Sequence, residues 1–193
     1  QLKNTAIMGV LADTTNTIAE GEVQQLINAG NPDTSEENYL EVVRKKTAVL
    51  FSAATECAAI LCHASPEQQA DLAAYGNHLG MAFQLQDDVL DYTGDATEMG
   101  KNIGDDLAEG KATLPLIYTI QNGSEIQSNL IRKSIADKDN SRIEEVAQAV
   151  QESGGLNYTQ KRAEKEVALA IAGLQSLQQS TFKLTLTDLA KFA

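Results

Sequence analysis

Apolar residues recur along the chain at helical spacing, and no stretch alternates between apolar and polar positions as a half-buried strand would. Ala, Leu, Gln and Glu are abundant and proline occurs only three times, a composition that favours helices. No internal repeat, low-complexity tract or linker interrupts the pattern, so we expect an all-α protein with one domain over 1–193. The predicted helices cover residues 2–29, 36–63, 67–92, 115–121, 125–136, 141–152, 155–178 and 183–192.

Local signals place the ends of these helices. Gly30, followed by asparagine and proline, is a stop signal for the first helix. Thr34 or Ser35 is the expected N-cap of the next helix, and Ser65, with proline directly after it, is the expected N-cap of the third. Residues 94–111 hold four glycines and no long apolar pattern, which predicts a loop with a functional role.

An acidic face lies near the end of the third predicted helix. At about 100° per residue, four polar side chains fall within an arc of roughly 100°: Gln84, Asp87, Asp88 and Asp91. Asp87 and Asp91 are four residues apart, where exposed like charges repel by about 0.2–0.5 kcal/mol and partly buried ones by more. A hard divalent cation with oxygen ligands, Mg²⁺ above all, would relieve this repulsion.

The alternative interpretation of the acidic face is a solvated surface without a ligand. Four apolar neighbours on the same helix argue against that alternative, because we expect them to lie in the core: Phe83, Leu85, Val89 and Leu90.

Composition restricts the class of partner and the compartment. The chain has 27 acidic against 15 basic residues and a formal net charge of −12, which argues against nucleic acid as a partner. No apolar run approaches the roughly 20 residues that span a bilayer. Cys57 and Cys62 lie five positions apart on one predicted helix and point in different directions, so we expect free thiols and a reducing, cytoplasmic environment.

Two basic sites could bind an anion. Lys101 and Lys111 each follow a glycine in the loop after the aspartates, and adjacent glycines let the backbone approach a polyanion. Either lysine alone is more simply a solvated surface residue, but cations on the aspartates with both lysines beyond them would accept a diphosphate. Lys46 and Thr47 form the second basic site, in mid-helix directly before an apolar turn, whereas the preceding Arg44-Lys45 is expected to be an outer charged stripe.

These segments resemble motifs of the trans-type polyprenyl diphosphate synthases. The run 80–91 with 100–107 and 110–115 resembles the second aspartate-rich motif and the lysine loop that follows it. Gly21–Leu26 and Lys46–Phe51 are similar to the two motifs that precede it in the family. Tyr39 with the residues before it, and the stretch 159–164, make the chain most similar to the octaprenyl-forming bacterial members. The resemblance covers nearly all 193 residues.

The resemblance implies a fold and a reaction. The fold would be the isoprenoid-synthase-type helical bundle around a central cavity. The reaction would be the Mg²⁺-dependent condensation of isopentenyl diphosphate with an allylic diphosphate such as farnesyl diphosphate. The product would be a long-chain all-trans polyprenyl diphosphate, octaprenyl by overall similarity, for the side chain of a quinone. The resemblance also implies a homodimer whose lipid product passes to membrane enzymes.

The resemblance assigns roles residue by residue. Asp87 would ligate Mg²⁺, and three further carboxylates would do so directly or through metal-bound water: Asp88, Asp91 and Asp106. Lys46, Lys101 and Lys111 would hold the allylic diphosphate. Gln84 and Thr47 would lie beside the carbocation and the attacking alkene. The catalytic set would therefore be Asp87, Lys46, Thr47 and Gln84.

Three parts of the family pattern do not occur in the 193 residues: the first aspartate-rich motif, the isopentenyl diphosphate-binding Gly-Lys-Arg-His set and an arginine pair. The first residues already read as helix interior. We therefore expect the chain to be the C-terminal two-thirds of such an enzyme, inactive alone. Other classes remain open: a non-catalytic partner subunit, a terpene cyclase, whose usual Asn-Ser/Thr-Glu metal motif is not found here, and a helical scaffold.

Overall fold

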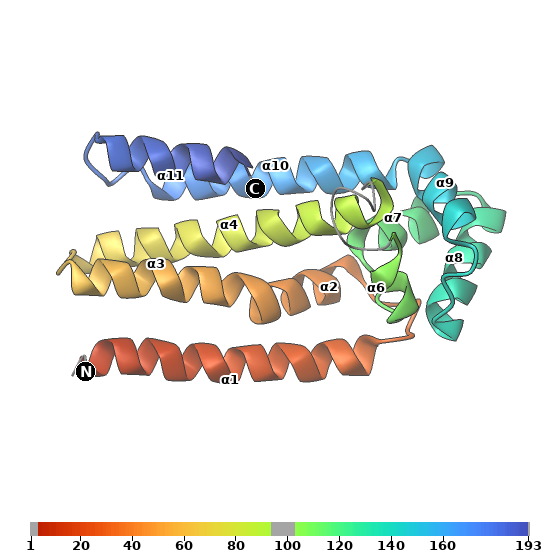
Figure 1. Cartoon of the computed structure of the whole chain (residues 1–193), viewed down its shortest axis with the longest axis horizontal. Coiled ribbons are helices and arrows are strands. Elements are labelled where there is room, and N and C mark those ends of the chain that lie inside the picture. The colour runs from red at the N-terminus through yellow and green to blue at the C-terminus, as the bar shows by residue number, and fades with distance from the viewer. Residues whose placement is uncertain (1–3, 94–102, 193) are drawn as a thin grey trace. The chain divides into compact units, whose positions relative to one another are not determined.

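Every regular element in the computed structural model, which describes residues 4–93 and 103–192, is a helix (Figure 1). The all-α prediction is therefore confirmed. None of the helices in these two ranges is both long and apolar enough to cross a membrane. The elements are α1 (Thr5–Asn28), α2 (Glu36–Val43), the π-helix η1 (Arg44–Ala48), α3 (Val49–Leu61), α4 (Pro66–Thr93), α6 (Asp105–Ala108), α7 (Leu114–Asn122), α8 (Glu125–Asp137), α9 (Ile143–Ser153), α10 (Gly155–Gly173) and α11 (Thr181–Phe192).

The predicted helix starts are confirmed by their capping bonds. Ser35 Oγ accepts a hydrogen bond from the Asn38 N–H at 3.2 Å, which selects Ser35 as the cap of α2. Ser65 Oγ accepts one from the Gln68 N–H at 3.2 Å, and the Gln68 side chain accepts one from the Ser65 N–H. This reciprocal pair is a capping box. Short polar side chains thus satisfy N–H groups that the first turn of each helix leaves unpaired.

Three predictions of element type or length are corrected. The helix expected over 36–63 contains η1, where the Val49 N–H donates to the Arg44 carbonyl five residues earlier, a register that hydrophobic spacing does not signal. The loop expected over 94–111 contains the short helix α6, although residues 94–102 lie outside the described part. The helix expected over 155–178 ends at Gly173. The chain then continues in turns whose backbone hydrogen bonds join residues three positions apart.

The chain divides into two compact units, each with its own core. The first takes its described residues from Gln1–Glu22, Val42–Gln84 and Ala163–Ala193. Its core joins α4, α10 and α11 through five buried residues: Tyr75, Leu79, Ala170, Leu174 and Ala190. The Tyr75 hydroxyl donates to the Leu186 carbonyl at 2.8 Å, so the phenol is satisfied as it is buried. The single-domain prediction stays a prediction.

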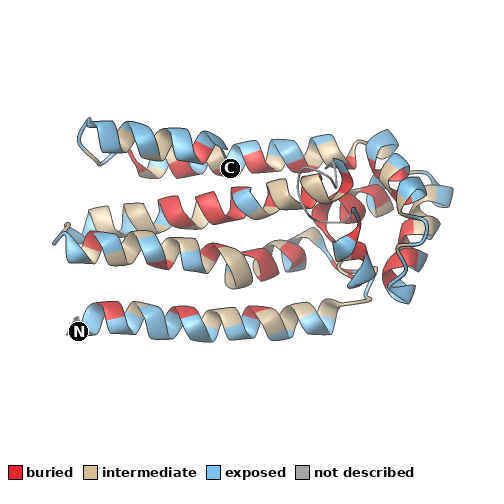
Figure 2. Ribbon diagram, viewed as in Figure 1, coloured by how far each residue is buried: buried red, intermediate tan, exposed pale blue. Residues whose placement is uncertain are grey.

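The second unit comprises Val23–Glu41 and Leu85–Arg162 and carries most of the candidate site. Helix α7 contributes a nearly continuous buried stretch to its core, visible as red ribbon in Figure 2. Its fully buried side chains include Leu85, Val89, Leu107, Leu114, Leu116, Ile131, Ile135, Val146 and Val150. Burial of this apolar surface holds α4, α6, α7, α8 and α9 together.

The expected core flank of the acidic face is correct at two positions and wrong at one. Leu85 and Val89 are fully buried, and Leu90 is partly buried. Phe83 is 49% exposed and packs on Phe51, with 5.6 Å between ring centroids. Position 83 lies about 200° around the helix from position 85, so the two side chains leave α4 on opposite sides.

Candidate functional site

Asp88 lies at the centre of the acidic face of α4 and is buried, with 1% of its surface exposed. The Tyr39 hydroxyl of α2 donates a hydrogen bond to Asp88 Oδ2. Burial and the charge of Asp88 raise the pKa of Tyr39 well above its ordinary value, so the phenol stays protonated and remains a donor. A buried carboxylate is costly unless it is paired, and Tyr39 supplies that partner.

Asp91 lies next to further carboxylates. The Gly104 N–H donates to the Asp91 carbonyl at 3.1 Å, which brings the start of α6 against α4. Burial and the charges of Asp106 and Asp105 raise the pKa of Asp91 to about 6, although hydrogen bonds from the backbone N–H groups of these two residues act in the opposite direction. Asp91 Oδ2 is buried and has no hydrogen-bond partner among residues 4–93 and 103–192. Burial and the neighbouring charges therefore disfavour the ionised form of Asp91, and a cation would stabilise it.

Asp106 and Lys111 form an ion pair at the end of α6. The Lys111 ammonium lies 2.7 Å from Asp106 Oδ1 and 2.8 Å from Glu109 Oε2. Burial alone would lower the pKa of Lys111, but the hydrogen bonds to both carboxylates raise it above its ordinary value. The lysine is thus fully protonated, and its side chain is held with 25% of its surface exposed.

A glycine contact fixes the segment that carries Lys111. Gly110 has a φ of +74°, and its carbonyl accepts a hydrogen bond from the Gly30 N–H at 2.8 Å. A Cβ at position 110 would lie 2.9 Å from Lys138 Cγ and 3.0 Å from the Gly30 nitrogen. Only glycine fits both the left-handed conformation and this close approach. The glycine before Lys111, which the sequence analysis connected with anion binding, therefore also sets the position of the lysine.

The other predicted site residues lie in the first unit. Thr47 Oγ1 donates to Gln84 Oε1 at 3.1 Å, which ties η1 to α4. Lys46 Nζ lies 2.6 Å from Glu22 Oε2 of α1. The structure pairs Thr47 with Gln84, a contact that the resemblance did not specify, and it pairs Lys46 with an acidic residue that the sequence does not indicate.

The donors on α4 and α6 fit a metal that takes only part of its coordination shell from protein. Among residues 4–93 and 103–192, no three His, Cys, Asp or Glu side chains form a group that could hold a metal alone. Mg²⁺ usually binds one or two carboxylates and completes its octahedron with water and phosphate oxygens. The Oδ2 atom of Asp91, which no described residue satisfies, and the charges around it match that requirement.

Several sequence predictions have other outcomes in the structure. Lys101 lies outside the described residues. Asp87 is partly exposed on α4, one turn before Asp91. Cys57 and Cys62 are free, as expected. Tyr39 and Glu109, which contact Asp88 and Lys111, were not identified as site residues, because nothing in their local sequence indicates a partner.

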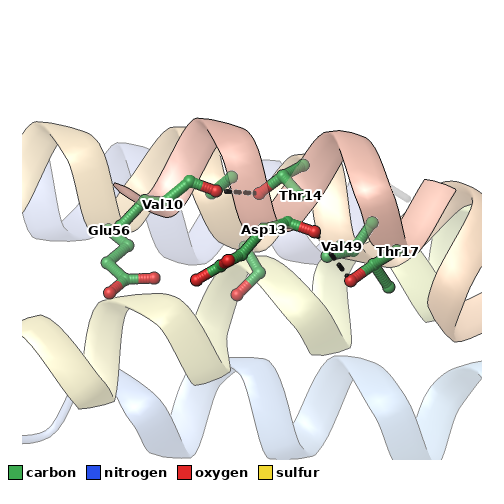
Figure 3. A pocket seen from close by; sticks show the side chains of 8 residues that line it. Val10, Asp13, Thr14, Thr17, Val49 and Glu56 are labelled. Atoms are coloured by element: carbon green, nitrogen blue, oxygen red, sulfur yellow. Dashed lines mark hydrogen bonds between the residues drawn. The ribbon is translucent and has the colours of Figure 1, made fainter. Parts of the chain in front are cut away.

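A cleft of about 210 Å³ between α1 and α3 holds none of the predicted site residues (Figure 3). Its hydroxyl groups are already bonded to backbone: Thr14 donates to the Val10 carbonyl at 2.7 Å and Thr17 to the Asp13 carbonyl at 2.8 Å. The lining residues are Val10, Asp13, Thr14, Thr17, Val49, Ser52, Ala53 and Glu56.

Comparison with known proteins identifies related sequences over the whole chain. A family model described as "Polyprenyl synthetase" matches residues 1–153. Octaprenyl diphosphate synthase of Escherichia coli is 46% identical over 189 residues, which are 97% of this chain and 58% of that protein. An all-trans-nonaprenyl-diphosphate synthase (geranyl-diphosphate specific) of Rhodobacter capsulatus is 47% identical over 192 residues, 100% of this chain and 59% of the relative.

A solved structure with the same fold contains both a metal and a ligand. Polyprenyl synthase from Caulobacter crescentus CB15, crystallised with calcium and isoprenyl diphosphate, superposes with a TM-score of 0.93 at 34% sequence identity. The match covers 98% of this chain and 58% of that one. The chain therefore spans about 58% of the length of these relatives.

Proposed function

Because this chain belongs to the polyprenyl synthetase family, we propose that it forms part of a long-chain trans-prenyltransferase. The enzyme would condense isopentenyl diphosphate with an allylic diphosphate. The observation that carries the proposal is the arrangement at Asp91. This carboxylate has a buried oxygen with no partner in the described part of the chain, and it lies next to the charges of Asp105 and Asp106. Such a site suits a divalent cation that arrives with a polyanionic substrate.

In this proposal Asp87, Asp88, Asp91 and Asp106 bind Mg²⁺, either directly or through water. When bound, Mg²⁺ would neutralise the charge that accumulates on the departing diphosphate. The chain's own residues prepare this site. Tyr39 keeps Asp88 in place through its hydroxyl, and Lys111 does the same for Asp106 through its ammonium. Calcium in the Caulobacter crescentus relative supports a divalent cation, and Mg²⁺ is our specific proposal.

Lys46, Lys101 and Lys111 would bind the allylic diphosphate, and Thr47 and Gln84 would lie near the reacting carbons. A lysine ammonium is a compact charge with several donors, well suited to phosphate oxygens. The Thr47–Gln84 hydrogen bond holds both polar side chains in one orientation, so that their oxygens can face a developing positive charge. Apolar walls around them would keep water from the cation.

We further propose that the product has eight isoprene units, made from farnesyl diphosphate, for the side chain of a quinone. The relatives include an octaprenyl and a nonaprenyl synthase at nearly equal identity, so overall similarity supports a long chain more firmly than a particular length. The enzyme would work in the cytoplasm as a homodimer and pass its product to membrane enzymes. The two free cysteines suit a reducing compartment.

We also propose that the 193 residues alone do not catalyse the reaction. The relatives are longer, and the resemblance places a first aspartate-rich motif in their additional part. Helix α1 exposes large apolar side chains, among them Met8 at 62%, Leu26 at 66% and Ile27 at 75%. Such a surface suits packing against further protein. Expressed alone, the segment should be poorly soluble and give no condensation product.

Lys111→Ala should weaken the binding of the allylic diphosphate about ten- to a hundredfold, because a hydrogen bond to a charged group contributes about 1.5–3 kcal/mol. Steady-state kinetics of the full-length protein would measure the rise in KM, and a thermal melt would show a smaller effect on stability. Lys133→Ala is the matched control, since Lys133 is exposed on α8. An unchanged KM and kcat for Lys111→Ala would mean that this lysine only braces Asp106.

Consumption of isopentenyl diphosphate by the purified full-length protein separates the proposal from its main rival. We expect consumption with an allylic primer and Mg²⁺, and none in EDTA. If the protein consumes none alone but does so when mixed with a second synthase subunit, it is a non-catalytic partner. Retention of Asp87, Asp88, Asp91, Lys101 and Lys111 favours the active enzyme.

A further inference from the structure

Lys46 is held by an acidic residue of α1. Its Nζ atom lies 2.6 Å from Glu22 Oε2, and the two side chains are 33% and 47% exposed. The neighbouring pair, Lys45 and Glu20, is looser, with 3.9 Å between Nζ and Oε2 and with Glu20 70% exposed. The Lys46–Glu22 ion pair is therefore shorter than the Lys45–Glu20 pair between the same two helices. The shorter pair contains Lys46, the lysine proposed to bind the substrate.

The backbones of α1 and η1 lie in close contact beside this ion pair. A Cβ at Gly21, next to Glu22, would lie 2.8 Å from Lys45 Cβ and 2.9 Å from the Lys46 nitrogen. Real Cβ atoms essentially never approach other atoms this closely. Glycine at position 21 therefore lets helix α1 touch the backbone of η1 directly. The distance from the Glu22 carboxylate to the Lys46 ammonium is therefore set by a backbone contact as well as by the side chains.

The other side of η1 is packed in the same way against α4. A Cβ at Gly80 would lie 2.6 Å from the Cα atom of Ala48, so α4 also approaches the backbone of η1. One turn further along α4, Gln84 accepts the hydrogen bond from Thr47. The π-turn that carries Lys46 and Thr47 is therefore in close backbone contact with glycines of both neighbouring helices.

Two consecutive side chains of the π-turn reach different helices. In η1 the hydrogen bond spans five residues, from the Val49 N–H to the Arg44 carbonyl, so the turn contains one residue more than an α-helical turn. Lys46 contacts α1 through Glu22, and Thr47 contacts α4 through Gln84. Irregular turns of this kind often occur at functional sites.

We propose that Glu22 is a positioning residue for Lys46: it holds the ammonium in the orientation that binds the allylic diphosphate. This proposal rests on the proposed function of Lys46. A free lysine side chain loses much rotamer freedom when it binds a ligand, and prior ordering by Glu22 removes part of that loss. An ammonium has three donors, so it can keep its bond to Glu22 while it contacts phosphate oxygens.

Binding of inorganic diphosphate with Mg²⁺ to the full-length protein, measured by calorimetry, tests the proposal. Glu22→Gln should weaken the binding of diphosphate about three- to tenfold. This loss lies between that typical of an exposed ion pair and that typical of a residue which orients a ligating side chain. The melting temperature should not change. Glu20→Gln is the matched control on the same helix, and it should leave the affinity as it is.

Lys46→Ala and the double variant Glu22→Gln/Lys46→Ala complete the test. If Glu22 acts through Lys46, the double variant binds diphosphate no more weakly than Lys46→Ala alone. Equal affinity of Glu22→Gln and the unsubstituted protein would overturn the positioning role while Lys46 keeps its own. Additive losses would show that Glu22 acts elsewhere. An unchanged affinity of Lys46→Ala would show that Lys46 does not bind the diphosphate. The positioning role of Glu22 would then be overturned as well.

Discussion

Asp87→Ala should lower the turnover of the full-length protein by about two to three orders of magnitude, the loss typical when a group that stabilises transition-state charge is removed. Asp87 lies on the acidic face of α4, one turn from Asp91. Its removal relieves charge repulsion within this face, so we expect the fold to persist while metal affinity falls. Steady-state kinetics at saturating Mg²⁺ and a thermal melt in EDTA measure the two effects separately.

Glu67→Ala provides the control for this prediction. Glu67 is an exposed acid in the first turn of the same helix, so its removal changes the charge of α4 without touching the acidic face. Turnover of the control should stay near that of the unsubstituted protein. Near-normal turnover of Asp87→Ala at saturating Mg²⁺ would contradict the assignment of Asp87 as a metal ligand.

Asp91→Asn should change stability and metal binding in opposite directions. The pKa of Asp91 is raised to about 6 by burial and by the charges of Asp106 and Asp105. The folded protein therefore binds more protons than the unfolded chain between about pH 4 and 6, so stability falls as pH rises through that window. Above it, the ionised carboxylate costs about 1–2 kcal/mol once its partial exposure is taken into account.

Removing that charge should raise the melting temperature in EDTA at pH 7.5 by about 3–6 °C. At pH 5 the gain should be smaller, because Asp91 is then largely protonated in the folded protein. Mg²⁺ with diphosphate should stabilise the unsubstituted protein more than Asp91→Asn. Scanning calorimetry at both pH values measures these differences. A lower melting temperature for Asp91→Asn in EDTA would show that the carboxylate is stabilised by contacts other than a cation.

The sequence predicts those parts of the fold that depend on local chemistry. Ser35 and Ser65 cap their helices through residues three positions away, so the signal is contained within one turn. The π-turn η1 has no such local signal, and the close approach of Gly21 and Gly80 to it comes from other helices. The exposed position of Phe83 could have been expected from the helical spacing to Leu85.

The candidate site shows the same division. Helical periodicity places four polar residues of α4 on one face, and the structure shows that Asp88 of this face is buried. Its partner Tyr39 is 49 residues away, so only the tertiary structure reveals the bond. Lys111 and Asp106 are five residues apart, but their contact depends on the left-handed turn at Gly110. Pairings of this kind follow from packing and have no sequence signature.

Mass spectrometry of the extracted prenyl diphosphates shows whether the protein is a long-chain prenyltransferase. The full-length protein would be incubated with farnesyl diphosphate, an excess of isopentenyl diphosphate and Mg²⁺, with a parallel sample in EDTA. The proposed function predicts an all-trans product of eight isoprene units with Mg²⁺ and unextended primer in EDTA. Unextended primer in both samples would contradict the assignment as a prenyltransferase, and a product one unit longer than the primer would contradict the long-chain assignment.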